Sequence, residues 1–171
     1  VRQQAVFWIG QLRDDRAVTI LDEILRTERD AEVLDKAVFA LSQHRSERAA
    51  RMLRDLAQRD NVPKHQREQA IFWLGQQRSS ANNEMLIDLF TRVNDADLKD
   101  KIIFSLSQSR SPATDRWMMD LATNSREDIE IRKKALFWAG QNKSASTEGL
   151  ASLYDRMNDR EMKDQVIFVL S

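Results

Sequence analysis

The stretch AIFWLGQ, residues Ala70 to Gln76, decides the fold, because six versions of it divide the chain at nearly equal intervals. The versions begin at Ala5, Ala37, Ala70, Ile102, Ala135 and Val166, which gives a period of 31 to 33 residues. A fixed period in this range is typical of chains built from supersecondary units that stack on their neighbours. The sequence therefore predicts a repeat protein, a class that usually presents an extended surface rather than a catalytic pocket.

Each repeat contains two amphipathic helical patterns. In the first repeat the apolar residues keep helical spacing over residues 1–12 and again over residues 17–25. Pro112 follows Ser111, the order expected of a helix that starts after an N-cap serine. Acidic residues that can cap free backbone N–H groups stand just before the later first helices, at Asp30, Asp95, Asp128 and Asp159. We expect five helix pairs and a sixth first helix, which form an all-α superhelix.

The repeats are expected to form a single domain over residues 1–171. Their approximate boundaries are 1–29, 30–61, 62–94, 95–127, 128–158 and 159–171. Val1 already lies inside a repeat phrase, and Ser171 stands where the other copies continue to Gln. Because stacked repeats need polar capping units at their ends, we expect this chain to be a fragment of a longer protein.

Composition indicates a soluble chain without disulfide or thiol chemistry. The sequence has 27 Lys and Arg, 27 Asp and Glu, 42% hydrophobic residues and no cysteine. It has no apolar run of about 18 residues, so we expect no membrane partner. No targeting signal can be read from this stretch, and the compartment is left open.

Two of the phrases carry a family resemblance. VRQQAVFWIG from Val1 and IRKKALFWAG from Ile131 resemble the first helix of short HEAT repeats of the phycobilisome-lyase-like type. DRAVTILDEIL from Asp15 resembles the second helix of that unit. The resemblance implies a HEAT-like α-solenoid, and the FWxGQ form of the phrase resembles bacterial examples.

Aromatic residues recur inside the phrase. Trp8, Trp73 and Trp138 lie at what we interpret as a core angle of the first helix, so we expect them to pack inside. One phenylalanine stands directly before this position in each of the six phrases: Phe7, Phe39, Phe72, Phe104, Phe137 and Phe168. The favoured interpretation is that each Phe leans into the seam between repeats, and the alternative is an exposed Phe ridge that docks another domain.

One cation per repeat follows the phrase. These residues are Arg13, Arg45, Arg78, Arg110 and Lys143. Cations at helix C-termini complement the helix dipole, which is the simpler explanation. The alternative is contact with nucleic-acid phosphates, by resemblance to HEAT-like DNA glycosylases, with Trp117 as the aromatic side chain.

The second helices are expected to line the concave face, where solenoids commonly bind partners. On this face one column of residues changes from charged to apolar toward the C-terminus, and Met-rich surfaces adapt to varied partners. The candidate partner-binding residues are Arg51, Glu84, Ile87, Arg116, Trp117 and Met119. The alternative is that the apolar members fill the seam between repeats, with Trp117 over Gly149.

No catalytic, metal or cofactor site is predicted. The two histidines, His44 and His65, stand before Arg and Gln, whereas the HEAT-type deoxyhypusine hydroxylases hold iron with His-Glu pairs. No small-molecule substrate is inferred either. The sequence thus favours a scaffold, not an enzyme, that binds another protein or peptide through its concave face. Nucleic-acid binding and a passive spacer between domains are the alternatives.

Overall fold

The computed structural model describes residues 2–12, 14–142 and 146–171, without the side chains of residues 2 and 3. The described residues form eleven α-helices and no β-strand. They divide into two compact units, residues 1–77 and 78–171, and each unit is described by itself. The predicted all-α class, with five helix pairs and a sixth first helix, is confirmed.

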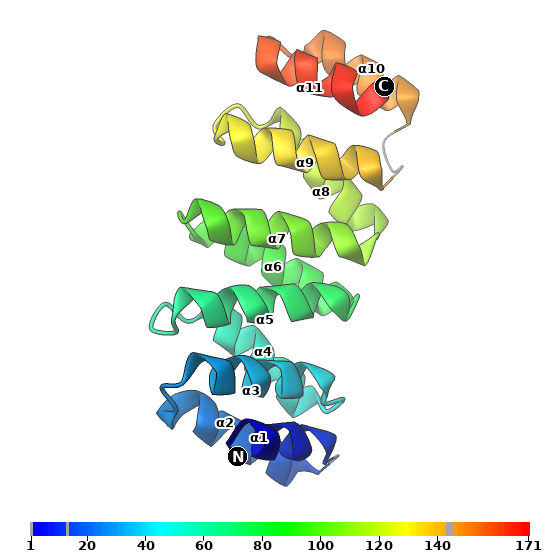
Figure 1. Cartoon of the computed structure of the whole chain (residues 1–171). Helices are drawn as coiled ribbons and strands as arrows, with labels where there is room; N and C mark the ends of the chain where they lie inside the picture. The colour runs from blue at the N-terminus through cyan, green and yellow to red at the C-terminus, as the bar shows by residue number, and fades with distance from the viewer. Residues whose placement is uncertain (1, 13, 143–145) are drawn as a thin grey trace. The chain divides into compact units, whose positions relative to one another are not determined.

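Unit 1 contains two layers of helices. Its helices are α1 (Arg2–Gln11), α2 (Asp15–Thr27), α3 (Ala31–Gln43), α4 (Glu47–Gln58) and α5 (Lys64–Gln76). The first helices α1, α3 and α5 pack side by side in sequence order, and α2 and α4 form the second layer behind them (Figure 1).

Unit 2 repeats this arrangement. Its helices are α6 (Ser80–Arg92), α7 (Ala96–Ser109), α8 (Pro112–Thr123), α9 (Ile129–Gln141), α10 (Thr147–Arg156) and α11 (Arg160–Leu170). The first helices α7, α9 and α11 pack on one another, and each also contacts the second helix that precedes it.

Side-chain caps start most of the helices, as the sequence predicts. Asp30 accepts hydrogen bonds from the backbone N–H groups of Glu32 and Val33 at the start of α3. Asp95, Asp128 and Asp159 cap α7, α9 and α11 in the same way. Pro112 opens α8 after Ser111, which forms a capping box with Thr114. These contacts fix where helices α3, α7, α8, α9 and α11 begin.

The core of the first helices comes from the aliphatic positions of the phrase. In α5, Ala70, Ile71 and Leu74 are completely buried. The predicted core position of the Trp residues is wrong: Trp8 is 67% exposed, and Trp73 and Trp138 are only half-buried. At 100° per residue, Trp73 lies roughly 110° around the helix from the centre of this aliphatic arc, at the edge of the first-helix layer.

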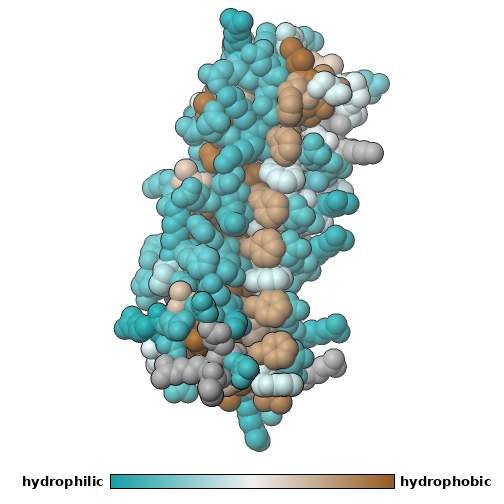
Figure 2. All heavy atoms as spheres, viewed as in Figure 1, coloured by the Kyte–Doolittle hydropathy of each residue, from teal (hydrophilic) through white to brown (hydrophobic). Residues whose placement is uncertain are grey.

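The six phenylalanines of the phrase do not all fit one interpretation: some are exposed, as in a ridge, and others are half-buried, as in a seam between repeats. Phe7, Phe39 and Phe168 are exposed, by 51%, 40% and 62%. Their equivalents in α5, α7 and α9 are half-buried. Figure 2 shows aromatic side chains over the first helices in each unit. The rings therefore cover the outer edge of the first helices instead of filling the interior.

Glycine in the phrase permits close helix contact. A Cβ atom at Gly10 would lie 2.7 Å from Cβ and 3.2 Å from Cα of Ala40, and one at Gly140 would clash with Cγ1 of Val169. The FWxGQ copies thus alternate with copies that place a small or branched residue opposite the glycine. This alternation sets how closely α1 approaches α3 and α9 approaches α11.

Arg110 ends α7 in the left-handed conformation, with φ 47° and ψ 44°. This conformation costs a residue with a side chain about 1–2 kcal/mol. We expect Arg110→Gly to raise the free energy of unfolding by about 0.5–1 kcal/mol, because the greater freedom of unfolded Gly offsets part of the relief. Urea denaturation measures the change. Arg116→Gly, in the interior of α8, is the control and should lower it by about 1 kcal/mol; a loss at both positions would contradict this assignment.

Candidate protein-binding surface

Buried arginines attach the second helices of the candidate surface to the next first helix. In unit 1, Arg67 of α5 is almost fully buried, and its Nε donates to the carbonyl oxygen of Ala57 in the last turn of α4 at 3.2 Å. Its Nη1 also contacts Asp60 Oδ1 at 3.1 Å. The last turn of a helix has unpaired carbonyl groups, so this guanidinium acts as a C-cap.

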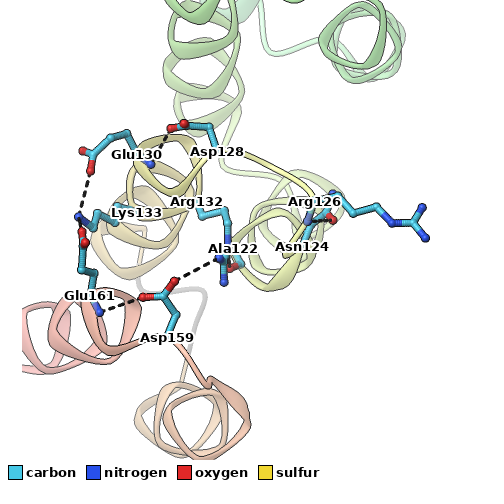
Figure 3. A network of polar contacts seen from close by, with 9 residues as sticks. All are labelled: Ala122, Asn124, Arg126, Asp128, Glu130, Arg132, Lys133, Asp159 and Glu161. Carbon is cyan, nitrogen blue, oxygen red and sulfur yellow. Dashed lines mark hydrogen bonds and ion pairs between the residues drawn. The ribbon is translucent and has the colours of Figure 1, made fainter.

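Arg132 plays the same part in unit 2. Its Nε donates to the carbonyl oxygen of Ala122 in α8 at 3.1 Å, and its Nη1 lies 3.9 Å from Asp159 Oδ2 (Figure 3). Asp159 in turn caps α11 by accepting from the backbone N–H of Glu161. One buried side chain therefore connects α8, α9 and the start of α11. Arg132, the arginine of the IRKKALFWAG phrase, thus has a structural role.

Lys133 joins α9 to α11 on the outside of this network. Its ammonium group donates to Glu130, 3.0 Å away, and to Glu161 (Figure 3). The hydrogen bond to Glu161, followed by that to Glu130, raises the pKa of Lys133 above its ordinary value. Both carboxylate side chains are largely exposed, so solvent screens the pairs and the charge orients the helices more than it stabilises the core.

The predicted residues of unit 2 lie on α6 and α8. Glu84 and Arg116 are exposed. Ile87 and Met119 are half-buried, so part of each apolar side chain is accessible to a partner. Charged side chains thus stand on the same helices as partly accessible apolar ones. This combination is typical of an interface with an apolar centre and a polar rim.

Trp117 is half-buried and packs edge-on against Phe90 of α6, with ring centroids 5.1 Å apart and planes at 86°. A Cβ placed on Gly149 meets only the Ser146 hydroxyl within 4 Å. The alternative that Trp117 lies over Gly149 is therefore wrong. The ring instead bridges α8 and α6.

Arg51, the remaining predicted residue, is exposed on α4 of unit 1. Its membership of one surface with the α6 and α8 residues stays a prediction.

A hollow of about 470 Å³ adjoins Trp117 and was not predicted from the sequence. Phe90, Asp120 and Asn124 contribute to its lining. Lys99 and Glu127 form an ion pair at its edge, with Nζ 2.7 Å from Oε1 and 2.9 Å from Oε2, and Lys99 also lies over the Phe90 ring. Phe90 is the one phenylalanine in the sequence outside the six phrases. This departure from the repeat is the sequence feature that could have indicated the hollow.

The predicted row of cations is only partly described. Arg45, Arg78 and Arg110 are exposed, whereas Arg13 and Lys143 lie outside the described residues. Trp117, the aromatic residue of the nucleic-acid alternative, is already in T-shaped contact with Phe90. No observation in the described parts of unit 1 or of unit 2 favours nucleic-acid binding over protein binding.

Each of the two histidines has a polar contact. His65 Nε2 lies 3.1 Å from Asp35 Oδ2, and His44 Nδ1 lies 3.0 Å from the Ser46 hydroxyl. Among the described residues, no group of three or more His, Cys, Asp or Glu side chains is placed to hold a metal ion.

Two layers of paired helices, capped at each repeat and joined by a buried arginine, define an α-helical repeat protein. In comparison with known proteins, a family model described as HEAT repeats matches residues 1–71. The predicted family resemblance is thus confirmed at the level of HEAT repeats. The curated proteins contain no match to this chain.

Among solved structures, the chain is similar to human deoxyhypusine hydroxylase in complex with glycerol. The TM-score is 0.54 and the identity 15%, and the match covers 99% of this chain and 77% of that one. At this identity the likeness shows the fold alone.

The prediction that this chain is not an enzyme is contradicted by this neighbour, because a HEAT-type fold there belongs to a hydroxylase. The inference from repeat architecture to the absence of catalysis was wrong, since a fold does not determine function.

Within the part of the chain that the structure describes, no helix has both the length and the apolar character needed to cross a membrane.

Proposed function

We propose that this helical repeat scaffold binds another protein through the surface of its second helices. The observation that carries the proposal is the pair of half-buried apolar residues, Ile87 on α6 and Met119 on α8, beside exposed Glu84 and Arg116. A flexible methionine and a branched aliphatic side chain supply area that is covered on docking, and the charges orient the partner.

Rigidity of the two helices supports the same proposal. Trp117 packs on Phe90 between α6 and α8, and Arg132 fixes the last turn of α8. A surface whose backbone is already fixed loses little conformational entropy when a partner docks. Interfaces are enriched in Trp and Met, so the exposed part of Trp117 extends the apolar centre.

The experiment is affinity capture from native lysate with the wild-type chain and an Ile87→Asp, Met119→Asp variant. We expect a protein that the wild type retains and the variant loses, because each carboxylate would have to be buried without a partner in the complex. Circular dichroism should give the same helicity for both chains. Equal capture by both would overturn the assignment of this surface.

A matched control adds the same two charges to the same two helices. Ala81→Asp and Ala113→Asp change exposed positions in the first turns of α6 and α8, where an acid suits the helix dipole. They lie six residues before Ile87 and Met119, or roughly 9 Å along the axis and a third of the way around the helix. Capture should survive in this control.

Salt separates protein from nucleic acid as the captured partner. Binding to a phosphate backbone weakens steeply as the logarithm of salt concentration rises, whereas an apolar protein contact changes little. We expect the captured material to be protein that remains bound from about 50 to 200 mM salt.

A further inference from the structure

One helix of unit 1 carries a polar residue at a position that is apolar in every other repeat. Gln66 of α5 stands four residues before Ala70, the start of its phrase. The equivalent residues before the other five phrases are all apolar: Val1, Val33, Leu98, Ile131 and Met162. Gln66 is nevertheless buried, with 5% of its surface exposed, as Val33 and Leu98 are. This departure from the repeat therefore places a carboxamide at a core position.

The oxygen of this carboxamide is left without a donor. Gln66 Oε1 is buried and accepts no hydrogen bond from the described residues. A buried acceptor in this state lowers stability, and a leucine, which α7 has at the same position, would avoid the cost. Such groups are rare in native proteins, and a bound molecule is one way to satisfy them.

Gln66 lines a hollow of about 250 Å³ between the ends of α2 and α4 and the start of α5. Apolar side chains form part of its wall, and these belong to Leu25, Leu34, Leu56, Val62 and Pro63. Pro63 directly precedes α5, and among α2 to α5 this is the one helix whose start receives no side-chain cap. The positive end of the α5 dipole therefore borders the hollow, beside the unpaired carboxamide.

Cations outnumber acids in the wall of the hollow: the arginines are Arg26, Arg29 and Arg59, and the acid is Glu28. Arg26 and Arg59 are each paired with an aspartate four residues earlier. Glu28 accepts hydrogen bonds from two backbone N–H groups. Arg29 is exposed, and no ion pair joins its guanidinium to the described residues. Its planar fork is thus free to bind a carboxylate through two hydrogen bonds.

We propose that this hollow binds the C-terminal residue of a partner peptide that ends in an apolar side chain. The terminal carboxylate lies on Arg29, the apolar side chain lies against Leu34 and Leu56, and the last peptide group lies on Gln66. A peptide group has one donor and one acceptor. The carboxamide of Gln66 offers the complementary pair, because its last torsion angle is soft.

The size and composition of the hollow favour this ligand over others. Ordinary ligand pockets have about 300–1,000 Å³, so the smaller volume here suits a single terminal residue. A phosphate group would match the arginines, but it has no apolar part to cover the leucines and no N–H group to donate to Gln66 Oε1.

The test is titration of the isotope-labelled chain with N-acetylglycyl-leucine, followed through the side-chain amide signals of Gln66 in proton–nitrogen NMR spectra. We expect a saturable shift with a dissociation constant of about 1 mM or tighter. The same peptide with an amidated C-terminus lacks the negative charge and should bind at least about 10-fold more weakly. The ester analogue, in which oxygen replaces the last peptide N–H group, should bind at least about 5-fold more weakly.

Variants assign these preferences to residues. Arg29→Ala should weaken binding of the peptide by at least about 10-fold, and Arg48→Ala, which removes an exposed arginine at the opposite end of α4, should leave it unchanged. Gln66→Leu should bind the peptide and its ester equally, as read from backbone signals around Arg29. Its urea midpoint should not fall, because Leu98 occupies this position in α7.

Four results would each overturn the proposal. They are the absence of a saturable shift, equal binding of the free and amidated peptides, a preference for the peptide over the ester that survives in Gln66→Leu, and inorganic phosphate that binds as tightly as the peptide. The last result would mean that the hollow recognises charge alone.

This inference does not rest on the proposed function. The chain with Ile87→Asp and Met119→Asp should bind N-acetylglycyl-leucine like the wild type, and Arg29→Ala should retain the protein captured through α6 and α8.

Discussion

Replacing Leu74 with Ala is expected to lower the free energy of unfolding by about 3 kcal/mol. Leu74 is completely buried in α5, together with Ala70 and Ile71. Truncation removes apolar contacts and leaves a cavity between helices that are already closely packed, so the loss exceeds the simple transfer free energy of the side chain. Urea denaturation followed by far-ultraviolet circular dichroism measures the change.

Leu12→Ala is the matched control for this prediction. The chemistry is identical, but Leu12 is 55% exposed, and substitutions at such positions usually change stability by less than about 0.5 kcal/mol. Similar losses at the two positions would contradict the placement of the core on the aliphatic arc of the phrase. A large loss at Leu74 alone supports it.

Arg132→Ala is expected to cost about 2–3 kcal/mol, since hydrogen bonds to charged groups are worth more than neutral ones. The guanidinium is almost fully buried and donates to the carbonyl oxygen of Ala122. Its removal leaves that carbonyl without its donor and Asp159 without its ion-pair partner. Thermal and urea denaturation should both report the loss.

Two further variants separate the geometry of Arg132 from its charge. Arg132→Lys keeps the charge but cannot reproduce the planar fork, so it should recover only part of the lost stability. Arg116→Ala removes an exposed arginine of α8 and should change stability by less than about 0.5 kcal/mol. If Arg132→Lys were as stable as the wild type, the fork geometry would be irrelevant.

Much of the fold can be predicted from the sequence because the same apolar pattern is repeated. A single apolar pattern around Ala70 is ambiguous, but six copies at a constant period define stacked helical units. The capping residues were also readable, since Asp30 or Ser111 acts on backbone only two or three residues away. Local interactions of this kind need no knowledge of the tertiary contacts.

The side-chain environment of the aromatic residues was harder to predict. Around the axis of α5, Trp73 is close to the buried Ala70. Helical spacing alone does not show how far around the helix the contact with the neighbouring helix extends. Pairing of Trp73 with Phe39 depends on how adjacent repeats are offset, which is a tertiary property. The range of positions around the helix that we took as buried was therefore too wide, and it included the Trp residues.

For the candidate surface, too, the helices could be predicted from the sequence but the contacts between them could not. The helices that carry Ile87 and Met119 were predicted, and both side chains are partly accessible. The contact between Trp117 and Phe90 joins two helices, and the adjoining Lys99–Glu127 pair joins α7 to the turn before α9. No short-range pattern in the sequence specifies those contacts.

We propose that the surface around Ile87 and Met119 binds a protein. The most direct measurement is the dissociation constant of the captured partner for three chains: wild type, Ile87→Asp with Met119→Asp, and the Ala81→Asp with Ala113→Asp control. We expect at least about a 100-fold weaker affinity for the first variant, which is the effect of losing roughly 2.8 kcal/mol at an interface centre, and wild-type affinity for the control. Equal affinities for all three chains, with helicity unchanged, would contradict it.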